Sequence, residues 1–425
     1  MKINWSGFSK KTYPERLKML RDSDLLSHEL QENLEKNETL SVAIADQLSE
    51  NVVGTFSLPF SIVPEVVVNN QAYTVPYVTE EPSVVAAASF ACKIINRSGG
   101  FSAHVQQRLM IGQVALYQVP DREQACQEIL NQKDQLLEIA NQAYPSIVKR
   151  GGGARELRVE KVSGQTDFLV VYLHVDTQEA MGANMLNTML EALKPHLESL
   201  SRGQSLMGIL SNYATESLVT SSCRIAFHYL SPNKDEAREL ADKIVLASHF
   251  AQADPYRAAT HNKGIFNGID ALLIATGNDW RAIEAGAHAY ASRDGLYRGL
   301  SLWTLDSEKE ELIGEMTLPM PIATKGGSIG LNPRVVLSHE LLGQPSAKDL
   351  AQIIVSMGLA QNFAALKALV GAGIQQGHMK LQAKSLALLA GAKEAEVPKL
   401  VDGLIAEKTF NLEKAKSILK EIRNK

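Results

Sequence analysis

The sequence contains few cysteines, and their spacing excludes the structures that cysteines most often build. Only Cys92, Cys126 and Cys223 occur among 425 residues. They are an odd number, lie far apart and form no C-x-x-C pattern. This arrangement favours reduced thiols over a disulfide framework or a zinc site. We therefore expect a cytoplasmic protein without a metal.

The sequence also lacks a strong excess of charge and a long hydrophobic run. Its formal net charge is -4, which argues against a broad nucleic-acid surface but allows a local cationic pocket. No apolar leader segment follows Met1, and apolar stretches such as 269–276 are too short to span a bilayer. We expect small-molecule partners, with no nucleic acid and no membrane.

Two familiar phosphate-binding motifs are absent: neither G-x-G-x-x-G nor the Walker sequence occurs. A glycine turn at 176–184 nevertheless precedes a helical pattern, and free N–H groups at such a helix start can cradle a phosphate around Gly182. From these residues alone, an ordinary strand-to-helix turn is the better interpretation. The glycines at 151–153 allow either close ligand approach or a flexible turn.

The length of the chain predicts two or three domains, because a single core usually stops growing below this size. Strands and helices alternate over 111–212, which indicates a compact α/β unit inserted between flanking segments. The other patterns predict short helices at 13–22 and 41–48, a hairpin at 63–78, a fully buried helix starting at Pro82, helices at 235–252 and 280–291, a strand at 269–275, and mostly helix beyond 347.

Residues 326–330 match the G-x-S-x-G pattern of serine hydrolases. That motif requires a strand followed immediately by a helix. Here prolines interrupt the segment before Ser328, and Asn332-Pro333 follows where the helix should continue. The context therefore argues against a serine nucleophile, although a hydrolase stays open as an alternative.

Residues 254–264 are dense in hydrogen-bonding side chains between two apolar elements, which is typical of a ligand site or a tight polar network. Asp279 would meet Lys263 if the predicted strand at 269–275 runs back alongside. A solvated ion pair is an equally good reading of these two residues. His378 follows Gly377 at a predicted helix start, where it could be a surface residue or a mobile acid.

Six segments in order resemble the soluble, class II HMG-CoA reductase family over essentially the whole chain. They are 50–54 (ENVVG), 80–83 (EEPS), 180–184 (AMGAN), 254–264 (DPYRAATHNKG), 276–279 (TGND) and 375–379 (QQGHM).

The resemblance implies an α+β fold: a large mixed domain around a central helix (1–110 and 213–373), an inserted small α/β cofactor domain that is not a Rossmann fold (111–212), and a helical C-terminal flap (374–425). It also implies a homodimer or higher homo-oligomer whose active sites are completed across the interface.

The implied reaction is the reduction of HMG-CoA to mevalonate and free CoA by two hydride transfers. The implied catalytic residues are Glu81, Lys263, Asp279 and His378. In these roles Lys263 stabilises the developing oxyanion, Asp279 orients Lys263, Glu81 transfers protons and His378 protonates the CoA thiolate.

Further positions follow from the same resemblance. Ser83, Arg257 and Asn267 would hold the HMG portion, whereas Gly182, Asn184 and Asn212 would contact the nicotinamide cofactor. Basic residues around the 151–153 glycines, above all Arg155, favour the 2′-phosphate of NADPH, although the nearby Glu156 could serve NADH instead.

Two alternatives stay open beside this reading. The same fold could run in the mevalonate-oxidising direction with NAD. A CoA thioesterase using Ser328 would release thiol without a nicotinamide cofactor.

Overall fold

A computed structural model describes the backbone of residues 3–371, 374–393, 395–407 and 409–424, and side chains outside 374–381. Its main sheet has six strands in the order β2-β1-β3-β8-β10-β9. The predicted hairpin is confirmed, and its turn places Asn69 and Asn70 at positive φ. The strands are β1 Phe60–Val68, β2 Gln71–Val78, β3 Phe101–Val105, β8 Leu218–Ala226, β9 Ser301–Asp306 and β10 Glu311–Pro319.

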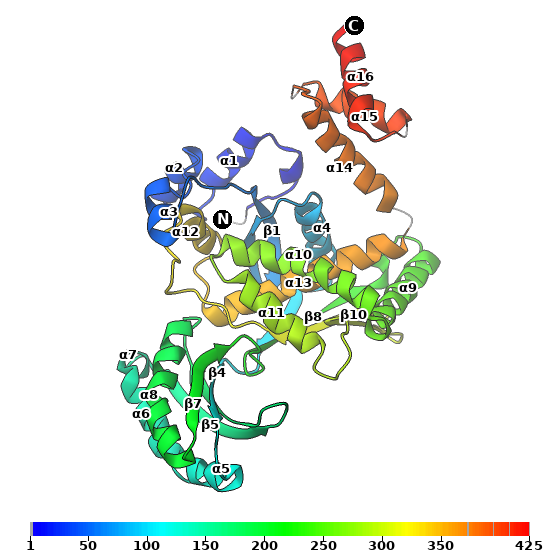
Figure 1. The fold of residues 1–425 in the computed structure, drawn as a ribbon. Helices are drawn as coiled ribbons and strands as arrows, with labels where there is room; N and C mark the ends of the chain where they lie inside the picture. The colour runs from blue at the N-terminus through cyan, green and yellow to red at the C-terminus, as the bar shows by residue number, and fades with distance from the viewer. Residues whose placement is uncertain (1–2, 372–373, 394, 408, 425) are drawn as a thin grey trace.

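Helices cover the main sheet and form one large apolar core with it (Figure 1). The most deeply buried of them is α13, which packs against α10 and α4. These helices are α4 Val84–Arg97, α9 Lys234–Ala253, α10 Pro255–Ala275, α11 Trp280–Ala291, α12 Pro333–Leu341 and α13 Ala347–Val370, with a short 3-10 turn η2 Phe227–Tyr229.

The residues between β3 and β8 form a second layered unit with its own core (Figure 1). Its four strands, in the order β5-β6-β4-β7, pair only in antiparallel fashion. A Rossmann sheet is mostly parallel. The elements are β4 Met110–Tyr117, α5 Arg122–Asn131, α6 Lys133–Ala143, α7 Pro145–Val148, β5 Gly153–Val162, β6 Phe168–Asp176, α8 Ala183–Ser201 and β7 Gln204–Ser211.

The two ends of the chain add helices around the main body. The N-terminal helices pack against α12, and the C-terminal helices have a separate small core that stands apart in Figure 1. They are η1 Phe8–Lys10, α1 Tyr13–Arg21, α2 His28–Glu35 and α3 Val42–Leu48, then α14 Ile374–Leu389, α15 Val397–Glu407 and α16 Leu412–Asn424.

Two sequence predictions about this body were wrong. The segment 269–275 is not a strand but the second half of the continuous helix α10. It is apolar because that half is buried beside α13 and β2, and a short apolar run cannot distinguish a buried strand from a buried helix. The helix predicted at Pro82 starts at Val84, and its exposed Phe90 and Lys93 show that it is buried on one side only.

One described helix, α13, is apolar and long enough to cross a bilayer by length and composition. In the sequence analysis, shorter stretches such as 269–276 were taken as the most apolar ones, and this longer segment was missed. In the structure 72% of its most apolar window is buried inside the protein. The core of the large unit therefore accounts for its composition.

Candidate functional site

Lys263 and Glu81 form an ion pair that joins two distant segments of the chain. Lys263 lies in the first half of α10, and Glu81 lies in the loop between β2 and α4. Both remain open to solvent, with side-chain exposures of 60% and 44%. Next to Glu81, Ser83 has φ 77 at the start of α4, a conformation that a non-glycine residue keeps only when its surroundings hold it. The structure thus brings three predicted site residues together.

Arg257 supplies a second cation on α10. Asp254 caps the helix by accepting a bond from the Arg257 backbone at 2.8 Å, and burial lowers the pKa of the Arg257 guanidinium. Within the described part of the chain, no carboxylate pairs with this guanidinium. Asn267 lies one helical turn beyond Lys263, on the same side of α10. The Arg257 guanidinium can therefore receive a carboxylate ligand.

His261 is a buried neighbour that the sequence reading did not single out. Its Nε2 lies 2.7 Å from the Ser301 hydroxyl and 3.1 Å from the Asn362 amide, while Nδ1 has no hydrogen-bond partner among the residues that the structure describes. Burial, followed by the charge of Arg257, lowers the pKa of His261 to about 3. A neutral imidazole therefore supports α10 from inside the core.

Asp279 does not lie beside Lys263 in the same chain. Its carboxylate caps α11, accepting bonds from the Arg281 and Ala282 backbones at 3.1 Å, and it pairs with the Arg281 side chain. Since α10 continues to Ala275, it rises roughly 18 Å after Lys263 at about 1.5 Å per residue. The prediction that a returning strand would join the two residues was wrong, because that strand is a helix.

Asp279 lies instead at the end of the molecule that carries the glycine turn. Asn212 follows the end of β7. A Cβ on Gly286 of α11 would lie 2.3 Å from the Asn212 carbonyl, so α11 packs directly against this end of β7. Gly182 begins α8 with φ 94, and a Cβ there would lie 2.3 Å from Thr177. Only glycine fits this tight turn.

The start of α8 has the features of a phosphate cradle. No side chain caps the helix, so its first N–H groups are free to bind an anion. Asn184 is exposed in the first turn of the same helix. Gly182, Asn184 and Asn212 therefore fit a dinucleotide at this end.

Arg155 lies at the edge of the triple glycine. It binds the Gly151 carbonyl and lies 3.5 Å from the Asp176 carboxylate. Glu156 faces away toward His174 and Lys133, at 3.7 Å and 3.8 Å. Arg155 therefore contacts the triple glycine and Asp176, the first residue of the 176–184 turn. Glu156, the carboxylate that could have favoured NADH, contacts other residues.

Two other predicted residues, His378 and Ser328, lie outside the regions described so far. His378 falls within α14, but its side chain lies outside the described residues. Ser328 is exposed in the long turn between β10 and α12. That turn is not the sharp strand-to-helix connection that a serine nucleophile requires.

A half-buried carboxyl pair between α10 and α11 was also missed by the sequence analysis. One carboxylate oxygen of Asp270 is buried and has no hydrogen-bond partner in the described part of the chain, and the neighbouring carboxyl group is that of Glu284. Burial first, and the Glu284 charge second, raise the pKa of Asp270 to about 8. An acidic residue inside an otherwise apolar run was the available signal.

The raised pKa predicts how stability depends on pH. The folded protein holds a proton that the unfolded chain releases near pH 4, so stability falls between about pH 4 and pH 8. Asp270→Asn should flatten this slope and stabilise the fold at pH 8 by about 1–3 kcal/mol. Unfolding by urea at pH 5 and pH 8 measures this effect. Asp242→Asn, at an exposed site on α9, is the control, and equal slopes in all three proteins would contradict the prediction.

Comparison with known proteins identifies what the chain is similar to. Residues 12–383 match the family model described as hydroxymethylglutaryl-coenzyme A reductase. A 3-hydroxy-3-methylglutaryl-coenzyme A reductase of Archaeoglobus fulgidus is 40% identical, covering 98% of this chain and 94% of that protein.

Solved structures give a closer match. A 3-hydroxy-3-methylglutaryl-coenzyme A reductase from Streptococcus pneumoniae is 76% identical, with a TM-score of 0.87, over 99% of this chain and all of that one. A class II structure from the same organism, bound to NADPH in open conformations, is 77% identical with a TM-score of 0.86, over 87% of this chain and all of the other.

Proposed function

The chain belongs to the hydroxymethylglutaryl-coenzyme A reductase family and, as a class II member, reduces HMG-CoA to mevalonate; we propose that Glu81, Lys263, Asp279 and His378 catalyse this reaction. The observation that supports it best is the Glu81–Lys263 pair, together with Arg257 in the first turn of the same helix, whose guanidinium pairs with no carboxylate among the described residues. Arg257 would bind the HMG carboxylate, with Ser83 and Asn267 contacting the rest of that portion. This binding places the thioester carbonyl at Lys263.

Lys263 stabilises the oxyanion that forms when hydride reaches the thioester carbon. Such a cation is most effective when it is already in place before the charge develops. Glu81 forms an ion pair with Lys263 and holds its ammonium group in position. Once it has taken up a proton, Glu81 can supply that proton to the oxygen during the reduction of the aldehyde, and Lys263 beside it then stabilises the carboxylate that is left.

NADPH supplies the hydride in both steps. Gly182, Asn184 and Asn212 would hold this cofactor, with its pyrophosphate at the start of α8. Arg155 would hold its 2′-phosphate. The mevalonate-oxidising direction with NAD remains the second candidate, since the reaction is reversible and the same residues would serve it.

We further propose that each complete site combines two copies of the chain. We call Glu81, Arg257 and Lys263 the substrate half of the site. The second half of α10 separates it from Asp279 and the glycine turn. Asp279 of a second copy would therefore face Lys263 of the first. The apolar residues Val53, Phe56 and Tyr256 are almost fully exposed in the single chain, which supports a protein partner at the substrate half.

The remaining assignments complete the proposal. The chain divides into 1–110 with 213–373, 111–212, and 374–425; three separate apolar cores support this division, although the core of the middle unit also includes Met110 and Ala214. His378, on the last of them, protonates the CoA thiolate. The enzyme is cytoplasmic, consistent with its three free cysteines.

One assay tests the reaction and its alternative together. NADPH oxidation and CoA thiol release are followed in the same sample with HMG-CoA. Reduction consumes about two NADPH per thiol, since the thioester accepts two hydrides. Thiol release without NADPH would instead support a thioesterase.

Cofactor choice gives a separate prediction. Arg155→Ala should raise the KM for NADPH by about 10-fold or more, because a charge-assisted bond to phosphate contributes about 1.5–3 kcal/mol. The KM for NADH should not change. Arg158→Ala, on the same strand but stacked on Tyr172, is the matched control. Equal efficiency of the unsubstituted enzyme with NADH would contradict the role of Arg155.

A further inference from the structure

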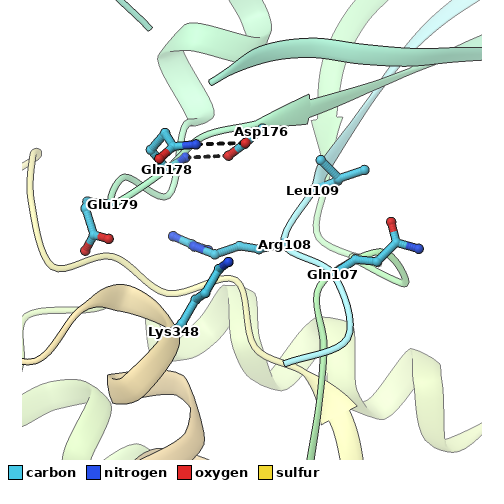
Figure 2. A pocket seen from close by; sticks show the side chains of 7 residues that line it. All are labelled: Gln107, Arg108, Leu109, Asp176, Gln178, Glu179 and Lys348. Carbon is cyan, nitrogen blue, oxygen red and sulfur yellow. Dashed lines mark hydrogen bonds between the residues drawn. The ribbon is translucent and has the colours of Figure 1, made fainter. Parts of the chain in front are cut away.

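A small polar cavity lies where the inserted unit meets the large one (Figure 2). Its volume is about 240 Å³. Arg108 extends into it between Glu179 and Lys348 (Figure 2). The lining residues are Gln107, Arg108, Leu109, Asp176, Gln178, Glu179 and Lys348.

Arg108 links the two units through main-chain carbonyls. It belongs to the connection from β3 to β4, and its Nη2 donates to the Ala180 carbonyl at 3.0 Å and to the Ile322 carbonyl at 2.6 Å. Ala180 belongs to the glycine turn at 176–184, which we call the cofactor turn. Ile322 follows β10 in the large unit. One half-buried guanidinium therefore holds the turn to the large unit.

Glu179 makes a second connection to the same segment. Its carbonyl accepts bonds from the Thr324 and Lys325 backbones at 3.0 Å and 3.2 Å. Its carboxylate accepts bonds from the Thr324 hydroxyl and, at 2.8 Å, from the Ala347 backbone at the start of α13. The cofactor turn is thus bound to segment 322–325 through both its main chain and a side chain.

Segment 322–325 continues the connection to Asp279. The Ala323 backbone donates to the Asn278 side chain at 2.7 Å, and that side chain donates back to the Ala323 carbonyl at 3.1 Å. Asn278 immediately precedes Asp279, the cap of α11. Hydrogen bonds and the main chain between them therefore connect the glycine turn to the residue that precedes Asp279.

We propose that Arg108 and Glu179 are positioning residues. They hold the cofactor turn at a fixed position relative to Asp279, so that the bound cofactor and the carboxylate are correctly placed for the same substrate. The proposal rests on the proposed function. Neither side chain needs to touch substrate or cofactor. Misplacing reacting groups by about 1 Å can cost about 100-fold in rate. Loss of this connection should therefore slow chemistry more than it weakens binding.

The test compares Arg108→Ala and Arg108→Lys with Arg224→Ala, whose side chain pairs with Glu311 within the main sheet. Turnover of HMG-CoA and of mevaldehyde is measured with NADPH and with NADPH deuterated at the transferred hydrogen. Arg108→Ala should lower kcat for both substrates by about 10- to 100-fold and increase the isotope effect. Arg108→Lys should recover part of the loss, and Arg224→Ala should match the unsubstituted enzyme.

A second variant keeps the test decisive even if Arg108→Ala does not fold. Thr324→Val removes the hydroxyl that binds Glu179 and preserves shape, so it should also increase the isotope effect. If Arg108→Ala does not fold, this variant and Arg108→Lys decide the question. Unchanged kcat and isotope effects in the folded variants would overturn the positioning role. If Lys263→Ala is inactive in the same experiment, the proposed function stands regardless of that result; an active Lys263→Ala protein would overturn the proposed function itself.

Discussion

Lys263→Ala should abolish both hydride transfers while the protein stays folded. The side chain is 60% exposed and forms an ion pair with Glu81, which is also exposed, so the fold does not depend on it. Loss of one preorganised oxyanion donor costs about 10²–10³ in rate, and loss of a cation should cost at least as much. Turnover of HMG-CoA and of mevaldehyde measures the effect.

The control for this experiment is Lys234→Ala. Lys234 is an exposed lysine on α9 that also pairs with a glutamate, Glu310, far from the substrate half along the chain. It should leave turnover unchanged. A folded Lys263→Ala protein with near-normal turnover would remove Lys263 from the mechanism.

His378→Gln should separate the two halves of the reaction. Only the thioester step expels a thiolate, and an unprotonated CoA thiolate re-adds readily to the aldehyde. Turnover of HMG-CoA should therefore fall by about 10²–10⁴, the usual contribution of a general acid. Reduction of free mevaldehyde should survive, because in the proposed mechanism that step uses Lys263 and Glu81 but expels no leaving group.

Both activities are measured on one preparation, with circular dichroism to verify folding. His249→Gln, at an exposed site on α9, is the matched control. Parallel loss of both activities in His378→Gln would argue against thiolate protonation. It would indicate instead a general failure of the C-terminal helices to close over the site.

Much of the fold followed from local patterns. Trp280–Ala291 is predicted and observed with the same bounds, because an Asp279 cap precedes a regular apolar spacing. The inserted unit was recognisable from its alternating strands and helices.

The errors have a common physical cause. Periodicity reports burial on one face, and it fails where an element is buried on several sides, as in the second half of α10. That single error placed Asp279 beside Lys263 in one chain. Arg108 and Glu179 were missed for another reason: their partners are mostly main-chain groups from distant segments, which leave no pattern in the sequence.

The proposed site uses two copies of the chain, and mixing two inactive variants tests this most directly. Lys263→Ala and Asp279→Ala proteins are denatured together, refolded as a mixture and assayed with HMG-CoA and NADPH. Half of random dimers are mixed, and each mixed dimer regains one intact site, so activity should return to about a quarter of normal. Activity no higher than that of either variant alone would contradict a site shared between copies.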